Sequence, residues 1–261
     1  MVQALRYLGE TPSQTAGPYV HIGLIPHQAG FDIFNKNFSN VLVGADTPGE
    51  RIRIEGRVFD GIGAPLKDVL LEIWQANAAG RYNHPADRQD KPLDKAFRGW
   101  GRAGSDFETG LYAFETVKPG SVIGRRGHRP MAPHVNLWIV ARGINIGLAT
   151  RMYFSDEEVA NTADPVLNII EPDIRRRTLI AQREMRGQSA VYTFDIYLQS
   201  DRETVFSTYR LHHPTRCGTA LDGRRGVICS HRGRALQIRH FCKVIRSEAK
   251  PLLNGRGGCE R

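Results

Sequence analysis

The residues with the clearest chemical potential are a histidine, a tyrosine and an arginine. His134 opens an apolar stretch, Arg142 follows the same stretch, and Tyr82 ends a Gly-Arg-Tyr turn. A lone histidine in this place is either a satisfied structural residue or a reactive one. Tyr82 is suited to capping a core, and Arg142 is either a solvated turn residue or a clamp for an anion. These residue types alone assign no reaction.

Motifs of several common enzyme classes are absent from the sequence. The histidines before residue 207 form neither H-x-x-x-H nor H-x-x-E-H, which argues against a metalloprotease (His21, His27, His84, His128, His134). The sequence has no G-x-S-x-G, no Walker loop and no G-x-G-x-x-G after an apolar strand. All four cysteines follow residue 206, so residues 1–206 can form neither a disulfide nor a thiolate metal site (Cys217, Cys229, Cys242, Cys259).

The elements that must position these residues are mainly strands. Apolar residues alternate with charged ones from Arg51, at Ile52, Ile54 and Val58, which predicts a strand. Further apolar or alternating stretches predict strands over Val69–Gln75, Leu111–Val117, His134–Ala141, Leu148–Phe154 and Ala190–Gln199. Residues 81–110 read as a loop. We therefore predict a mainly β fold, an antiparallel β-sandwich over residues 51–206, preceded by an irregular N-terminal arm over residues 1–50.

A short helical insert interrupts the strands. Ser155–Glu158 fits the S-x-x-E capping box, and Asp173–Gln182 is rich in helix-forming residues. The longest apolar run is too short for a membrane span, and the first residues lack the apolar stretch of a secretory signal. We expect a cytoplasmic protein.

The positive charge of the chain is confined to its last segment. Residues 207–261 hold 12 of the 36 basic and three of the 27 acidic residues, which leaves 24 of each kind in residues 1–206. The formal net charge of +9 therefore belongs to the tail, and a nucleic-acid reading based on the overall charge would depend on the tail alone. Its low hydrophobicity predicts that the tail is disordered.

Several ordered motifs together resemble the intradiol ring-cleavage dioxygenases. They are TPSQTAGPYVHIGL from Thr11, EIWQANAAGRY from Glu72, TVKPG from Thr116, RPMAPHVN from Arg129, ARGINI from Ala141 and MYF from Met152. The resemblance spans about residues 8–206. Within the family, the chain most resembles the α chains of the αβ enzymes that act on protocatechuate. It implies an enzyme of aromatic catabolism that contains Fe(III).

Members of the resembled family hold Fe(III) with two tyrosines and two histidines, and phenolate oxygen suits this hard ion. The matching positions here are Tyr82, Val122, His134 and Asn136. Valine cannot bind a metal, and an amide is a poor substitute for imidazole. We therefore predict that these are vestigial ligand positions, that this chain holds no metal, and that no catalytic residue lies within it alone.

The resemblance to α chains supplies a role that needs no iron in this chain. In such αβ hetero-oligomers the β chain holds the Fe(III), and segments of the α chain line the substrate cavity. The residues that match these segments are Gly17, Pro18, Tyr19 and Arg142. The resemblance implies cleavage of protocatechuate with O2 to 3-carboxy-cis,cis-muconate. Gly17-Pro18 is also compatible with a plain turn.

Other interpretations stay open from the sequence. The chain could be a self-sufficient enzyme of altered chemistry that uses Tyr82 and His134. It could be an inactive structural paralogue of intradiol dioxygenases, or a basic-tailed protein that binds nucleic acid. Iron content separates the first of these from an α chain, and salt-dependent DNA binding tests the last.

The resemblance ends at Phe206, and the composition changes there. Residues 207–261 contain ten arginines, two lysines, four of the nine histidines and every cysteine. An out-of-frame reading of a GC-rich gene tends to give this composition. Cys229-x-His231 and His240-x-Cys242 do not have the spacing of zinc fingers. We therefore interpret residues 207–261 as a segment that is not a native functional domain.

Overall fold

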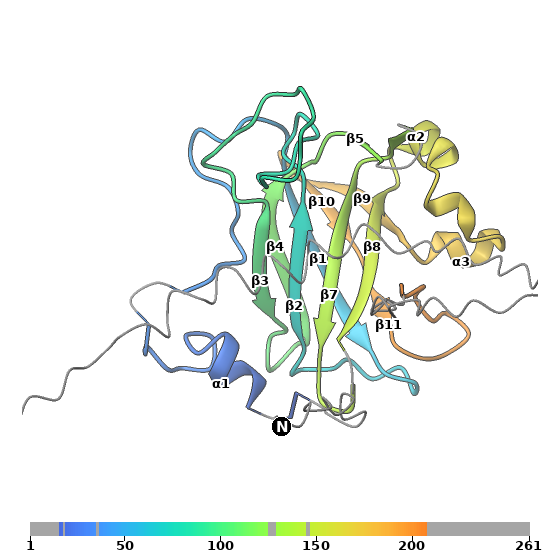
Figure 1. Ribbon diagram of the computed structural model, residues 1–261. Coiled ribbons are helices and arrows are strands. Elements are labelled where there is room, and N and C mark those ends of the chain that lie inside the picture. Colours follow the sequence, from blue (N-terminus) through green and yellow to red (C-terminus); the bar gives the residue numbers. More distant parts are fainter. Residues whose placement is uncertain (1–15, 18, 35–36, 125–128, 145–146, 208–261) are drawn as a thin grey trace, which may run out of the picture. The chain divides into compact units, whose positions relative to one another are not determined.

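The computed structural model describes residues 16–17, 19–34, 37–124, 129–144 and 147–207 (Figure 1). The chain divides into two units, residues 1–207 and residues 208–261, and the second lies wholly outside the described part. The predictions for the tail and its cysteines therefore concern residues that the structure does not describe. The described part of the chain contains no helix long and apolar enough to span a membrane.

The described residues form a mainly β structure with a few short helices, which confirms the predicted fold class. The strands are β1 (Arg51–Phe59), β2 (Leu70–Gln75), β3 (Trp100–Gly104), β4 (Leu111–Val117), β5 (Val122–Ile123), β6 (Pro130–Met131), β7 (His134–Val140), β8 (Leu148–Phe154), β9 (Ile180–Arg186), β10 (Ser189–Thr193) and β11 (Ile196–Tyr197). The helices are α1 (Val20–Leu24), α2 (Glu158–Ala163), α3 (Asp173–Arg177) and the short 3-10 turn η1 (Leu167–Ile169).

Nine of the strands in the described ranges join into one folded sheet. One half contains β4, β1, β10 and β9, and the other contains β3, β2, β7 and β8, with β9 pairing to both β10 and β8. Most pairs are antiparallel, as predicted. However, β1 pairs with β10 and β11 in parallel, and β8 pairs with β9 in parallel. The sheet is therefore mixed rather than wholly antiparallel.

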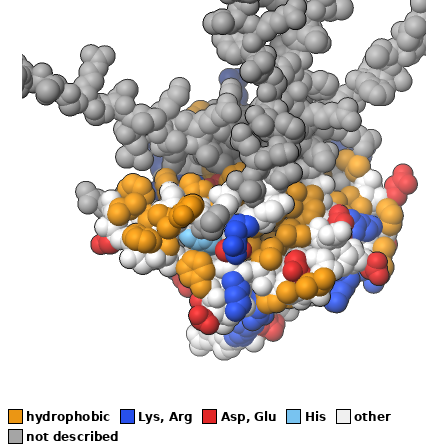
Figure 2. Space-filling model, turned by 90° about the horizontal axis from the view of Figure 1, so that it is seen from below, with side chains coloured by type: hydrophobic (Ala, Val, Ile, Leu, Met, Phe, Trp, Pro, Cys, Tyr) orange, Lys and Arg blue, Asp and Glu red, His pale blue; other side chains and the backbone are white. Residues whose placement is uncertain are grey.

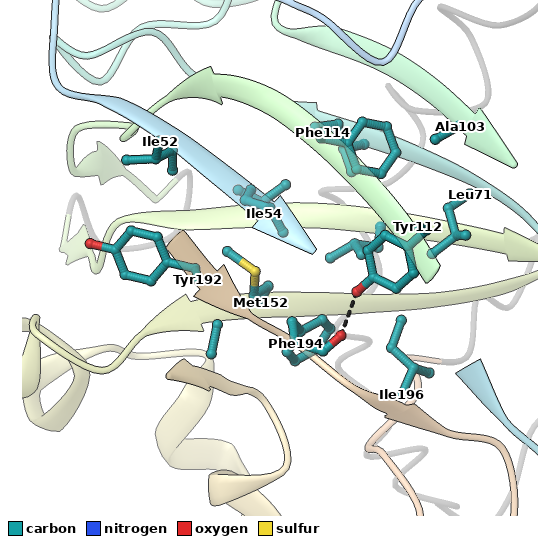
Figure 3. Packing of buried hydrophobic residues seen from close by; sticks show 14 of the residues in the cluster. Ile52, Ile54, Leu71, Ala103, Tyr112, Phe114, Met152, Tyr192, Phe194 and Ile196 are labelled. Atoms are coloured by element: carbon teal, nitrogen blue, oxygen red, sulfur yellow. Dashed lines mark hydrogen bonds between the residues drawn. The ribbon is translucent and has the colours of Figure 1, made fainter. Parts of the chain in front are cut away.

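Apolar side chains from both halves of the sheet meet in one buried core. Figure 3 shows part of it, including Ile54 of β1, Leu71 of β2 and Met152 of β8. The hydroxyl of Tyr112 on β4 donates a hydrogen bond to the carbonyl oxygen of Phe194 across this core (Figure 3). The alternating apolar pattern of the strands thus builds a sandwich, because each half has one face to bury.

Two stretches predicted as single elements are divided. Asp173–Gln182, predicted as helical, contains α3 only to Arg177, and β9 begins at Ile180 because Ile180 and Ala181 pair with Tyr153 and Phe154 of β8. Pairing within the sheet outweighs helix propensity here. Ala190–Gln199, predicted as one strand, is interrupted at Phe194 and Asp195, where β10 ends and β11 has not begun.

Two further predictions were wrong in detail. Ser155 caps no helix: its hydroxyl accepts a hydrogen bond from the backbone N–H of Arg183, and α2 begins at Glu158 without a side-chain cap. The predicted loop over residues 81–110 contains β3, which pairs with β2 along its whole length.

The N-terminal arm is fixed to β3 by polar contacts. Arg102 donates one hydrogen bond to Glu72 over 2.7 Å and another to the carbonyl oxygen of Leu24, the last residue of α1, over 3.0 Å. Gln28 accepts a hydrogen bond from the N–H of Gly104 and donates one to the carbonyl oxygen of Ser105. The described part of the arm, which we predicted as irregular, thus contains one short helix that is held in place against the sheet.

Candidate functional site

Three of the four positions that we predicted as vestigial ligand positions meet around the hydroxyl of Tyr82. His134 and Asn136 lie two residues apart on β7, so their side chains share one face of the strand. The Tyr82 hydroxyl oxygen lies 3.4 Å from Nε2 of His134, and Nδ2 of Asn136 donates a hydrogen bond to it over 3.3 Å. The fourth position, Val122, is buried with Ala76 and Met131, and Tyr82 packs against this group.

Neighbouring groups fix the orientation of this cluster. The ring of Tyr82 stacks on Trp74 of β2 at 5.6 Å between centroids, nearly parallel. Nδ1 of His134 lies 2.7 Å from the carbonyl oxygen of Ala132, which can only accept, so Nδ1 carries the proton. In a neutral ring Nε2 is then left as an acceptor for the Tyr82 hydroxyl. The pair is therefore a phenol that donates to a neutral imidazole.

Burial sets the ionisation of both groups. Burial, together with the nearby charge of Arg151, lowers the pKa of His134 to about 3. Burial raises the pKa of Tyr82 above its ordinary value, although Arg151 and the amide of Asn136 act in the opposite direction. At neutral pH the site therefore contains a neutral imidazole and a protonated phenol.

Arg151 is a buried charged residue of this cluster that the sequence analysis missed. It lies on β8 directly opposite Asn136, and its Nε donates a hydrogen bond to Oδ1 of that amide over 3.0 Å. Its Nη1 lies 3.7 Å from Sδ of Met131, and its side chain is almost wholly buried. Burial acts to lower the pKa of Arg151, but Tyr153, Tyr82 and Asp164 outweigh burial and keep the pKa raised.

Asp164 connects the cluster to the helical insert. Its side chain accepts hydrogen bonds from the backbone N–H groups of Ala132, Val166 and Leu167 over 2.7–2.8 Å, and one from the Tyr153 hydroxyl over 3.3 Å. Asp164 therefore holds the turn before His134 and supplies negative charge near Arg151. A sequence pattern does not reveal this role because Ala132 and Tyr153 lie far from Asp164 in the chain.

The residues present around Tyr82 do not fit Fe(III). Val122 offers no donor atom, and the Asn136 amide already bonds Tyr82, Arg151 and the carbonyl oxygen of Trp74. The buried guanidinium adds a repulsive charge: two unit charges 4 Å apart repel by about 4 kcal/mol in a partly screened site, and a trivalent ion by about three times that. Among the described residues, no group of three or more His, Cys, Asp or Glu side chains is placed to hold a metal ion.

The residues predicted to face a substrate lie at the other end of β7. Arg142 follows this strand, is largely exposed, and forms an ion pair with Asp68. Val20 of α1 packs with Leu70, and Ala16 and Val140 lie against them, which brings the start of α1 to the same end of the sheet. Gly17 has a positive φ of 66°, and Tyr19 is 74% exposed. Pro18 lies outside the described residues.

The charges of Asp68 and Arg142 both affect the pKa of His21 in α1. Burial lowers the pKa of His21, Asp68 raises it and Arg142 lowers it further. Val140, two residues before Arg142, packs with Val20 of α1, so the Arg142 turn lies near this helix. In Figure 1, α1 and the downward end of β7 lie at the bottom, and β5 lies at the top. The two sets of predicted residues thus occupy opposite ends of one strand.

Comparisons with known proteins show the family of the chain. Residues 32–200 match a family model described as Dioxygenase. The chain is 48% identical to the protocatechuate 3,4-dioxygenase alpha chain of Pseudomonas putida over 203 residues, 77% of this chain and 98% of that one. It is 41% identical to the alpha chain of Burkholderia cepacia, over 76% of this chain and 97% of that one. The beta chain of Burkholderia cepacia is 37% identical over 61% of this chain and 69% of that one.

The fold and these matches define a dioxygenase-type β-sandwich. The chain belongs to the intradiol dioxygenase family, whose members depend on iron. Within that family it is similar to alpha chains that are named separately from beta chains. The predicted resemblance to the alpha chains of this family is confirmed.

The lowered pKa of His134 predicts a specific loss of stability in mild acid. The unfolded chain takes up a proton at this histidine below about pH 6.5, whereas the folded chain does so only near pH 3. The free energy of unfolding should therefore fall as the pH falls through this window, by about 2 kcal/mol between pH 7 and pH 5 from this group. Urea unfolding at pH 7 and pH 5 should show a smaller fall in the free energy of unfolding for His134→Gln than for the unaltered chain. Equal falls in the two proteins would contradict the neutral, buried imidazole.

Proposed function

We propose that this chain is the α subunit of a protocatechuate 3,4-dioxygenase. In this proposal a β chain holds the Fe(III), and the αβ complex cleaves protocatechuate with O2 to 3-carboxy-cis,cis-muconate. The alpha-chain relatives, matched over nearly their whole length, support the assignment. The existence of a separately named beta chain supports a hetero-oligomer.

The observation that carries the proposal is the separation of two sets of residues along β7. His134 and Asn136 lie at its start, and Arg142 follows its end at Val140. Six residues of strand span about 20 Å, so Arg142 cannot serve a reaction centre beside His134. An exposed arginine at the far end instead suits a reaction centre that another chain supplies.

The described part of the arm exposes apolar side chains, as a contact surface does. Large apolar side chains of the arm are exposed, between 37% and 74% of each: Tyr19, Ile22, Leu24, Phe31, Ile33 and Phe34. Seen from below, this end carries groups of hydrophobic side chains between charged ones (Figure 2). Exposed apolar surface of this extent commonly marks a protein interface. The described part of the arm therefore suits contact with the proposed β partner.

In the proposed mechanism, iron held by the β chain supplies the activation of the catecholic diol toward O2. This chain contributes binding and exclusion of water. The guanidinium of Arg142 attracts the carboxylate of protocatechuate, for which it must exchange its ion pair with Asp68. The ring of Tyr19 adds apolar surface against the substrate or the partner, which lowers the local dielectric and strengthens that attraction.

The alternatives meet specific difficulties. A self-sufficient enzyme would need Tyr82 and His134 to reach a substrate, but these groups bond each other beside the buried Arg151. An inactive paralogue remains distinguishable by experiment. A nucleic-acid binder would depend on the basic residues after position 207, which lie outside the described part of the chain.

Co-expression with a β chain of the same source tests the proposed function. We expect the two chains to purify together, to contain iron, and to consume O2 with protocatechuate. The chain without its partner should show no such consumption. A complex that forms but does not turn over would favour the inactive paralogue, and failure to form a complex would contradict the α-subunit assignment.

Arg142→Ala in that complex should lower kcat/KM for protocatechuate at least tenfold, because the substrate carboxylate loses its counter-charge. The free energy of unfolding should change by less than about 0.5 kcal/mol, as it does for most substitutions of exposed side chains. Arg177→Ala is a matched control, since Arg177 also forms an exposed ion pair, with Asp173 on α3. If kcat/KM of Arg142→Ala stayed within twofold of the unaltered complex, Arg142 would be only a solvated turn residue.

We propose further that residues 208–261 are dispensable. The match to the Pseudomonas putida alpha chain uses 98% of that chain but only 77% of this one. The backbone of Ser207 still pairs with Ala149 of β8, so the truncated chain should end there. Truncation after Ser207 should leave assembly and ring cleavage unchanged.

Resequencing around the codons for Phe206 and Ser207 should reveal a frameshift. An in-frame gene, together with loss of activity on truncation, would show that the tail is functional.

A further inference from the structure

The vestigial site contains a buried cation of its own. The guanidinium of Arg151 bonds Asn136, contacts Met131, and interacts electrostatically with the hydroxyl of Tyr82. Met131 pairs with Val122 in the two-stranded sheet of β5 and β6. Arg151 thus touches, directly or through one residue, the groups at three of the four vestigial ligand positions.

We propose that Arg151 is the resident cation of this chain, and that its charge replaces a metal ion and keeps one out. This inference concerns only residues of this chain, so it stands or falls independently of the proposed αβ function. The loss of two ligands is not the whole explanation in this proposal. Arg151, which occupies none of the four ligand positions, excludes the metal.

The groups that face Arg151 suit a fixed positive charge. Tyr153 lies two residues along β8, Tyr82 lies beyond Asn136, and Asp164 approaches from the segment after α2. His134 on β7 is held neutral and so adds no competing charge. The hydroxyls of Tyr82 and Tyr153 and the carboxylate of Asp164 also have other hydrogen-bond partners, so the guanidinium adds a positive charge to an oxygen-rich network that is already hydrogen-bonded.

If the proposal is correct, restoring the two missing ligands will not be enough for this chain to bind iron. Val122→Tyr with Asn136→His completes the set of two tyrosines and two histidines, but it leaves the guanidinium in place. A buried like charge opposes a metal ion whatever the ligand set. Arg151→Gln removes the charge and keeps an amide that can bond the neighbouring side chain. Arg151→Lys retains the charge and serves as the matched control.

The test compares iron binding by three variants of the full chain: Val122→Tyr/Asn136→His, the same with Arg151→Gln, and the same with Arg151→Lys. Each is incubated with ferrous ammonium sulfate in air and desalted. Elemental analysis should find about one iron per chain, with a visible phenolate-to-iron absorption band, only when Arg151 is Gln. The proposal would be overturned if the double variant bound as much iron as the Arg151→Gln triple variant. It would also be overturned if a folded Arg151→Gln triple variant bound no iron.

A second measurement covers the case in which the multiple variants do not fold. In the otherwise unaltered chain, Arg151→Lys should lower the thermal unfolding midpoint by less than half as much as Arg151→Gln, because lysine keeps the charge that Tyr153 and Asp164 face. An equal loss for both variants would show that Arg151 acts through its shape and hydrogen bonds rather than its charge, and would contradict the proposal.

Discussion

A charged guanidinium inside a protein needs partners, and this requirement organises one end of the sandwich. Arg151 bonds the amide of Asn136 and faces Tyr82, Tyr153 and Asp164. Asp164 in turn accepts the backbone N–H of Ala132, whose carbonyl oxygen orients His134. The neutral imidazole, the protonated phenol and the segment after α2 thus form one connected polar network. Removal of one member would leave others buried without partners.

β7 separates this closed network from the surface that we propose to act in the complex. The strand is central in its half of the sheet, between β2 and β8, so its two ends hold fixed positions. The polar network lies at its first residues, and the Arg142 turn and α1 lie at its last. In our proposal, the fold has lost its own reaction centre at one end of β7, and the other end serves the partner chain.

Local pattern was enough to predict most of the sandwich. Leu111–Val117 and Leu148–Phe154 were predicted with the bounds of β4 and β8, because alternation or a continuous apolar run survives wherever a strand faces the core. β3 escaped prediction because its five buried residues include two glycines and Arg102. β9 escaped because Ile180 belongs to a helix-favouring stretch and becomes a strand only by pairing with β8. The site was predictable only in part: the resemblance to intradiol dioxygenases identified His134 and Asn136, whereas Arg151 joins them only through the cross-strand register of β7 and β8.

Iron content of the purified αβ complex tests the central claim most directly. The account predicts one iron per αβ pair, held by the β chain, and no iron in this chain when it is purified alone. Tyr82→Phe in this chain should leave both the iron content and the visible absorption of the complex unchanged. Two irons per pair, or iron and absorption that fall with Tyr82→Phe, would show that this chain binds metal itself and would contradict the account.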